Sequence, residues 1–347
     1  MSEAQDAAAG EAAAGLPPKR LRDIVEAWLP PLLVPLIVLV GLPLIGGLPQ
    51  WLTLTLAGLS MGMMIFLMAA GLSLVFGLMD VLNFGHGAFI TFGAFIAASV
   101  LVPLNAWVTA ESLPLNLLAV LIAVAAAVLF GLAMGFLFER IVIRPVYGQH
   151  LKQILITMGA LIVAEQLVPV IWGALPVSVP MPNAFAGTVI VGEATLERYR
   201  LLAVAFGVLV YIATYLTLTR TRIGLIIRAG VENRDMVEAL GYRVTAVFIG
   251  VFVAGSALAA VGGVMWGLYR EIITAHVGNE VMILVFIVVI IGGLGSLRGS
   301  LVGALLVGLV TNYTGFLAPK LALGSTLLLM VLILLWRPTG LYPATKT

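Results

Sequence analysis

Hydrophobic segments dominate this chain and are separated by short polar stretches. Ten of these segments approach the roughly 20 apolar residues that a membrane-spanning helix needs. They cover residues 29–48, 52–79, 87–103, 115–138, 154–172, 200–219, 246–268, 281–297, 299–317 and 321–336. The third and the last three are short or closely spaced, so one or two can be re-entrant. The pattern predicts an all-α polytopic membrane protein with about 8–10 transmembrane helices and broken or re-entrant segments.

Composition agrees with a membrane protein. Of the 347 residues, 62% are hydrophobic and only 10% are charged, and the mean hydropathy is +1.16. Soluble domains are about 45–50% apolar and about a quarter charged. The net charge of +2 is too small to suggest a nucleic-acid partner, and the absence of cysteine excludes disulfides and cysteine-based metal sites.

Basic residues predict the orientation, because cytoplasmic loops carry an excess of Lys and Arg. With ten spans that start inside, all but four of the eighteen basic residues lie in the cytoplasm. The four outside are Arg198, Arg200, Arg270 and Lys320. We therefore expect residues 1–28 to form a cytoplasmic N-terminal tail, 29–342 a transmembrane domain, and 343–347 a cytoplasmic C-terminal tail.

Residues 173–199 form the longest external loop in this layout. The pattern PVSVP, Pro-Asn and then TVIVG predicts a small β-hairpin. Such a hairpin can receive a partner or cap a cavity, and it can equally be an ordered linker without a further role.

A polar interruption breaks the apolar sequence between residues 72 and 97. After Asp80 the chain reads VLNFGHG and then becomes apolar again. In a bilayer, non-helical backbone is tolerated only inside protein or beside a water-filled cavity. We therefore expect a broken helix near a substrate pathway, lined by Asn83, Phe84, His86 and Gly87. The alternative is a short cytoplasmic turn whose polar groups meet water.

A second candidate break lies among the glycines that follow residue 291. Gly292, Gly293 and Gly295 resemble a helix break, and they are candidate pathway residues because matched interruptions in two halves of a chain indicate a transport pathway. Gly299 and Gly303 continue a small-xxx-small ridge, which is typical of close helix packing.

The cytoplasmic loop 220–245 is expected to contain a short helix. Asn233 is a suitable N-cap, and Gly241 follows the end of the helix. Met236, Val237 and Leu240 would present apolar side chains among charged ones, which suits docking into a groove on a soluble partner. The alternative is an ordinary basic loop that only sets the topology.

Two other classes of protein fit the sequence less well. A secondary transporter often needs intramembrane carboxylates, and Glu165 is the one acid well inside an expected span, where it can line a polar cavity, bind a cationic group or satisfy a neighbouring helix. A membrane enzyme is discounted, because His86, His150 and His276 are too scattered for a metal site and no nucleophile motif is present.

Three motifs together resemble a known family. In chain order they read GLSLVFGLMDVLNFGHGAFITFGAFIA, RAGVENRDMVEALGYRV and IIGGLGSLRGSLVGALLVG. They are similar to the H-type permease subunit of the bacterial ABC importers for leucine, isoleucine and valine, over residues 51–342. Relatives with the same motifs import urea, short amides or aromatic acids, so the substrate is not specified.

The resemblance implies a transport subunit of the inner membrane, not an enzyme. Expected partners are a second, M-type permease, two cytoplasmic ATPases and a periplasmic binding protein. The chain lacks the phosphate-binding motif G-x-x-x-x-G-K-[ST], so we expect it to bind no cofactor itself and ATP-Mg to bind the ATPases. Residues to which the resemblance assigns ATPase coupling are Arg228, Glu232, Asn233, Met236, Val237, Glu238, Leu240 and Gly241.

Overall fold

A computed structural model describes the backbone of residues 21–342. The expected tail residues 1–20 and 343–347 lie outside this part, as do the side chains of residues 21–28 and of Leu78, Val231, Glu232, Arg234 and Asp235. The expectation about the tails therefore stays a prediction.

Helices make up most of the described chain. They are α2 (Leu21–Ile45), α3 (Leu48–Met79), α4 (His86–Leu101), α5 (Asn105–Val108), α6 (Leu113–Phe138), α7 (His150–Trp172), α8 (Arg198–Arg220), α9 (Arg222–Glu232), α10 (Arg234–Ala239), α11 (Val244–Arg270), α12 (Val277–Gly292), α13 (Leu297–Leu317) and α14 (Ala322–Trp336). A π-helical turn (Glu139–Ile143) and a 3-10 turn (Arg144–Val146) extend α6, and a second 3-10 turn (Pro319–Leu321) precedes α14.

Seven helices in the described range are long and apolar enough to cross a membrane. Three shorter apolar helices, at Leu29–Ile45, α4 and α12, accompany them. This confirms the prediction of an all-α polytopic membrane protein with broken segments.

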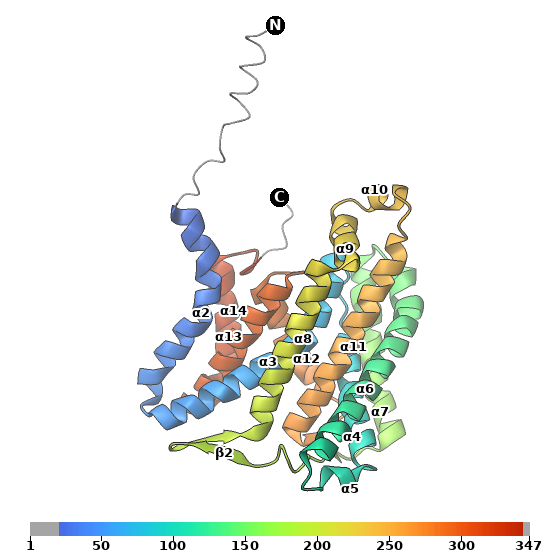
Figure 1. Cartoon of the computed structure of the whole chain (residues 1–347). Coiled ribbons are helices and arrows are strands. Elements are labelled where there is room, and N and C mark those ends of the chain that lie inside the picture. Colours follow the sequence, from blue (N-terminus) through green and yellow to red (C-terminus); the bar gives the residue numbers. More distant parts are fainter. Residues whose placement is uncertain (1–20, 343–347) are drawn as a thin grey trace.

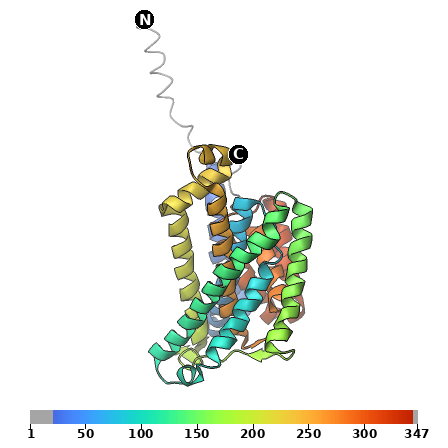
Figure 2. The same ribbon diagram turned by 90° about the vertical axis from the view of Figure 1, so that its right-hand side faces the viewer.

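The bundle has two distinct ends (Figures 1 and 2). One end, here called the loop end, carries α9 and α10. The opposite hairpin end carries α5 and the strands β2 (Thr188–Val191) and β3 (Ala194–Glu197). Helix α3 starts at the hairpin end, where the Thr53 hydroxyl donates to the carbonyl of Thr195 (3.2 Å).

The strands confirm the expected hairpin and add a second pairing. β2 and β3 pair antiparallel, with Val191 opposite Ala194. The short strand β1 (Val177–Ser178), by contrast, pairs with β4 (Ile272–Ile273), which directly follows α11. The external loop is therefore attached to the end of α11, which the sequence pattern did not indicate.

The core lies around α3, which is buried along most of its length between α11 and α13. Glycine allows the backbones to approach closely, as expected in membrane helices. A Cβ atom on Gly62 of α3 would lie 2.7 Å from the Ala304 carbonyl of α13. A Cβ on Gly303 would lie 2.8 Å from the Val288 carbonyl, so the packing role expected for Gly303 is confirmed. Helices α6, α7, α8 and α14 surround this core and expose many apolar side chains.

Candidate functional site

The chain turns back into the bundle directly after α3. Asp80 follows the last residue of α3 and has φ of 52°, in the left-handed region. Residues 81–85 are not helical, and the Phe84 N–H donates to Oγ1 of Thr157 on α7 (3.2 Å). Nε2 of His86, the first residue of α4, lies 2.9 Å from the carbonyl of Met68. At 1.5 Å per residue, α4 therefore starts roughly 16 Å back along α3 from its end.

A second break of the same form follows α11. Glu271 has φ of 58°, and Asp80 and Glu271 are the two non-glycine residues with positive φ in residues 21–342. The chain then runs without helix until Val277 starts α12. The two breaks have the same backbone hydrogen bonds. The N–H of Glu271 donates to the carbonyl four residues before it (2.9 Å), and the N–H of Asp80 does the same (2.9 Å). The N–H of the first residue of each following helix, α4 or α12, donates to the carbonyl three residues before it.

The two short helices meet at their N-termini. Gly87 and Gly278 each lie seven residues after the acidic residue of their break, and a Cβ on Gly278 would collide with the Gly87 carbonyl. The Thr91 hydroxyl joins them, because it accepts from the N–H of Gly278 (3.1 Å) and donates to the carbonyl of Gly87 (3.1 Å). A Cβ on Gly87 would also lie 3.2 Å from Leu161, the central residue of α7. The meeting point is thus near the middle of the bundle.

The two breaks are related by inversion. α3 runs from the hairpin end to the loop end, and α11 runs the opposite way (Figure 1). Helix α4 therefore leads from the centre to the hairpin end, and α12 leads from the centre to the loop end. Helix N-termini carry partial positive charge, and paired half-helices of this kind suit the recognition of anionic groups in transporters.

The glycines after residue 291 are not the matching break. Gly292, Gly293 and Gly295 lie in the turn between α12 and α13, where Gly293 has φ of 94°. The Tyr342 N–H donates to the carbonyl of Gly292 (3.0 Å), and Gly295 lies directly against Gly77 of α3. The expected pairing of these glycines with residues 83–87 is therefore wrong, because they form the tight turn that joins α12 to α13. Their place in the pathway stays a prediction.

The expected pathway residues of the first break are mostly buried. Asn83 and His86 are each 1% exposed, so their polar groups do not meet bulk water as a surface turn would require. Neither amide atom of Asn83 has a hydrogen-bond partner among the described residues. An unpaired buried polar group costs roughly 1–3 kcal/mol, which makes Asn83 a candidate for a functional contact. The ring of Phe84 is half-buried and packs 4.7 Å from that of Phe286.

The second break exposes polar side chains that the sequence analysis did not assign. His276, Asn279 and Glu280 are exposed at the start of α12. Nδ1 of His276 lies 3.4 Å from Oε2 of Glu165, whose side chain is 10% exposed. Asn279 and Glu280 follow His276 by three and four residues, which is the spacing of one helical face and was the available signal. It was missed because the expected span began only at residue 281.

One face of α7 lines both breaks. Gln153, Thr157, Leu161 and Glu165 recur every fourth residue and are buried. The Gln153 and Glu165 side chains each keep one oxygen, Oε1, without a hydrogen-bond partner in the described structure. This face gives the centre of the bundle a polar stripe within an otherwise apolar helix.

The cytoplasmic loop has the expected short helix. The Asn233 side chain accepts from the N–H of Met236 (2.9 Å), and Gly241 has φ of 88°, so the expected caps of α10 are confirmed. Met236 is 62% exposed and Leu240 is 71% exposed. Val237 is only 5% exposed and packs into the core, so its expected place on the docking face is wrong.

The remaining coupling candidates surround α10. Arg228 is exposed on α9 and its Nε donates to the carbonyl of Gly224 (3.3 Å), whereas the Glu232 side chain lies outside the described part. Glu238 lines a hollow of about 520 Å³ at the loop end. Other residues around this hollow include Arg140, Arg144, Gly241, Tyr242 and Arg243. Tyr242, two residues after Leu240, is 51% exposed and was not among the expected contacts.

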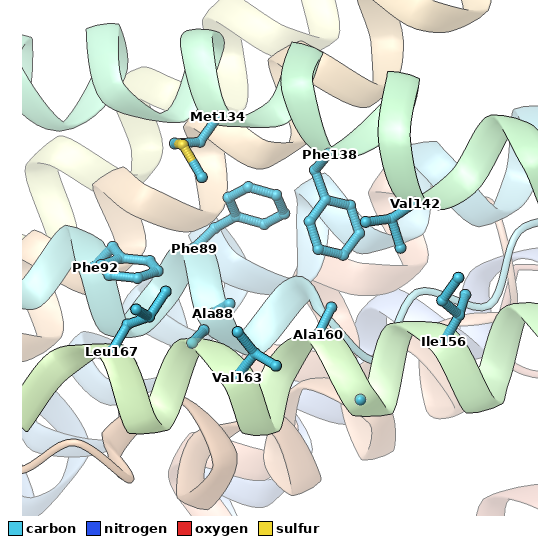
Figure 3. Close-up of a pocket in the computed structure, with 12 residues that line it drawn as sticks. Ala88, Phe89, Phe92, Met134, Phe138, Val142, Ile156, Ala160, Val163 and Leu167 are labelled. Carbon is cyan, nitrogen blue, oxygen red and sulfur yellow. The ribbon is translucent and has the colours of Figure 1, made fainter.

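A separate apolar groove of about 500 Å³ lies between α4, α6 and α7 (Figure 3). The rings of Phe89 and Phe138 pack edge to face across it, with centroids 5.4 Å apart. It is lined by Ala88, Phe89, Phe92, Met134, Phe138, Val142, Ile156, Gly159, Ala160, Val163, Ala164 and Leu167. With no charged or strongly polar side chain in its lining, this groove suits a hydrocarbon chain, and Glu165 is not among its lining residues.

Comparisons with known proteins agree on one family. A family model described as "branched-chain amino acid transport system / permease component" matches residues 54–336. The high-affinity branched-chain amino acid transport system permease protein BraD of Pseudomonas aeruginosa is 29% identical over 82% of this chain and 93% of its own length. LivH of Escherichia coli K12, which has the same description, is 26% identical over 82% of this chain and 92% of its own length.

A related permease of a second type is also similar. The probable branched-chain amino acid transport permease protein LivM of Methanocaldococcus jannaschii is 27% identical over 62% of this chain and 67% of its own length. No solved structure matches the chain with significance.

Proposed function

This chain belongs to the family of branched-chain amino acid transport permeases, and from that premise we propose that it is the H-type permease subunit of an ABC importer. Its substrates are branched-chain or other hydrophobic amino acids. An importer of the same family for urea, short amides or aromatic acids is the less favoured alternative, and an ion-coupled secondary transporter is less favoured still.

The meeting of α4 and α12 at Gly87 and Gly278 is the observation that carries this proposal. An amino acid brings a carboxylate, an ammonium group and an apolar side chain to the membrane centre. The N-termini of the two short helices favour the carboxylate. A mostly apolar surrounding admits aliphatic side chains with little discrimination, since one methylene is worth about 1–3 kcal/mol. Selection then rests mainly with a separate binding protein.

The translocation path lies between this chain and a second permease. Exposed polar groups at His276, Asn279 and Glu280 support this, because they stand level with the bundle centre, where lipid contact is costly. The likeness to an M-type permease supports a partner of related fold.

Energy comes from two ATPase subunits that bind the loop end. Met236, Leu240 and Tyr242 supply apolar anchors around α10, and the neighbouring hollow receives a side chain of the ATPase. ATP-Mg binds those subunits, and this chain, which lacks G-x-x-x-x-G-K-[ST], hydrolyses none. Closure of the ATPases moves α9 and α10 and shifts the bundle between inward-open and outward-open states.

The excess of basic residues at the loop end supports a cytoplasmic location for that end and for both termini. The hairpin end then faces the periplasm of the inner membrane, where a substrate-binding protein delivers the amino acid. β1 and β4 link the external loop to the second break, so docking there reaches the centre of the bundle directly.

Co-expression with the neighbouring transport genes tests the proposal. Purified complex in proteoliposomes should take up leucine only with ATP and the binding protein. Met236→Asp with Leu240→Asp should release the ATPase subunits or abolish binding-protein-stimulated hydrolysis, while the membrane part stays folded. Ile190→Asp is the matched control, because Ile190 is 73% exposed at the hairpin end. Uptake without ATPase subunits would contradict the ABC mechanism.

A further inference from the structure

One acidic side chain in the centre of the bundle has an unused oxygen. Glu165 is 7% exposed, and its Oε1 has no hydrogen-bond partner among the described residues. Its Oε2 faces Nδ1 of His276 at 3.4 Å, and the His276 side chain is 62% exposed. The carboxylate therefore has a partner at one oxygen only, and that partner, the His276 side chain, is mostly exposed.

A solute would reach this pair from the side of His276, because Oε1 of Glu165 is itself buried. Glu165 lies one turn beyond Leu161, which packs at the meeting point of α4 and α12. His276 immediately precedes α12, and the exposed Asn279 and Glu280 continue its polar face. A polar face of this kind at the middle of a membrane bundle borders water or a polar partner.

We propose that Glu165 binds the ammonium group of the transported amino acid, and that His276 occupies the carboxylate until the substrate displaces it. This inference rests on the function proposed above and assigns the residue that recognises the ammonium group of the substrate. The carboxylate of the same molecule is then directed toward the N-termini of α4 and α12, which lie on the adjoining side.

The chemistry favours an ammonium over other cations. An alkylammonium donates up to three hydrogen bonds and matches a carboxylate that has a vacant acceptor. A metal ion would need more ligands, and the side chains that the structure describes include no group of three or more His, Asp or Glu able to hold one. A proton relay would need a chain of titratable groups, whereas in the described structure the Glu165 carboxylate faces the imidazole of His276 alone.

Glu165→Gln tests the inference, since it removes the charge and keeps the shape. In proteoliposomes of the full complex with the leucine-loaded binding protein, leucine turnover should fall roughly 10-fold or more. Stimulated ATP hydrolysis should stay within about twofold of wild type, because the loop end is untouched. Gln166→Ala is the matched control: Gln166 is the exposed neighbour on α7, and it should transport normally.

A binding measurement separates ammonium recognition from a structural role. In saturation-transfer NMR on the purified complex without binding protein, wild type should prefer leucine to 4-methylpentanoate, which lacks the ammonium group. Glu165→Gln should lose this preference. Glu165→Asp should restore part of it, and His276→Ala, at an exposed position, should retain it.

The outcomes are distinct. Normal turnover and unchanged preference in Glu165→Gln would overturn the inference, as would loss of preference in His276→Ala with Glu165 intact. If Glu165→Gln does not assemble, the preference of Glu165→Asp and His276→Ala decides in the same way. Failure of wild type to transport leucine would instead overturn the proposed function.

Discussion

The two breaks in the bundle share one backbone path but differ in what surrounds them. Each follows an acidic residue with positive φ, Asp80 or Glu271, and each ends at a short helix that starts near the centre. At the first break, Asn83 and His86 are buried, and α4 packs mainly on α11 and α6. At the second, His276, Asn279 and Glu280 are exposed, whereas Val277 and Gly278 between them are buried.

This difference separates two roles that a broken helix can have. The buried break is held by contacts to the Met68 carbonyl and to Thr157, so it acts as a fixed support for the N-terminus of α4. The exposed break presents His276, Asn279 and Glu280 to the path and is attached to the external loop through β1 and β4. We therefore expect loss of the His86 contact at the first break to affect stability, and changes to His276, Asn279 or Glu280 at the second to affect contact with the solute.

The largest effect should come from the contact that both breaks share. Gly278→Val places a side chain against the Gly87 carbonyl and the Thr91 hydroxyl, where there is no room. The short helices must then separate, and we expect loss of the folded, assembled complex in size-exclusion chromatography. Gly250→Val on α11 is the control, because a Cβ there meets nothing within 4 Å. A well-assembled Gly278→Val complex would break the paired-helix description.

A smaller effect should distinguish the two histidines. His86→Leu removes the contact with the Met68 carbonyl in a fully buried place, so it should lower stability by about 1–3 kcal/mol and reduce transport. His276→Leu, at a side chain that is 62% exposed, should change stability by no more than about 0.5 kcal/mol. Thermal unfolding followed by intrinsic fluorescence measures both. Equal losses would remove the distinction between a buried and an exposed break.

The smallest change in stability is expected at Asn83. Its amide is buried without a partner in the described part, so Asn83→Leu should leave the melting temperature unchanged or raise it. Leucine uptake should nevertheless fall, because the amide is then absent from the pathway. Thr274→Val, the corresponding exposed position of the second break, serves as the control. Full uptake by Asn83→Leu would show that this amide only completes a turn.

The sequence predicted the first break and missed the second for a physical reason. Asn83 to Gly87 interrupts an apolar run, so hydropathy reveals it. Ile272 and Ile273 look like the continuation of an apolar segment, and Glu271 and Glu280 look like residues of an external loop. Hydropathy does not show that the chain re-enters the bundle between them, because the strand pairing with residues 177–178 directs it there.

Docking residues show a similar limit. The caps of α10 follow from local chemistry, so Asn233 and Gly241 could be predicted. Which face of one helical turn packs inward depends on the neighbouring helices, and the burial of Val237 beside the exposed Met236 could not be read from spacing alone. The glycines at 292–295 were misread for a related reason. A tight turn and a helix break have the same composition, and only the surrounding helices distinguish them.

The most direct test of the paired breaks uses the absence of cysteine from this chain. Single cysteines at Ser178, His276 and Asn233 would be labelled with a membrane-impermeant maleimide in intact spheroplasts. We predict fast labelling at Ser178, slower labelling at His276, and labelling at Asn233 only after the membrane is permeabilised. Depth-dependent quenching should then place His276 between the other two. No labelling at His276 from outside, or a position at the membrane surface, would contradict the central placement of the second break.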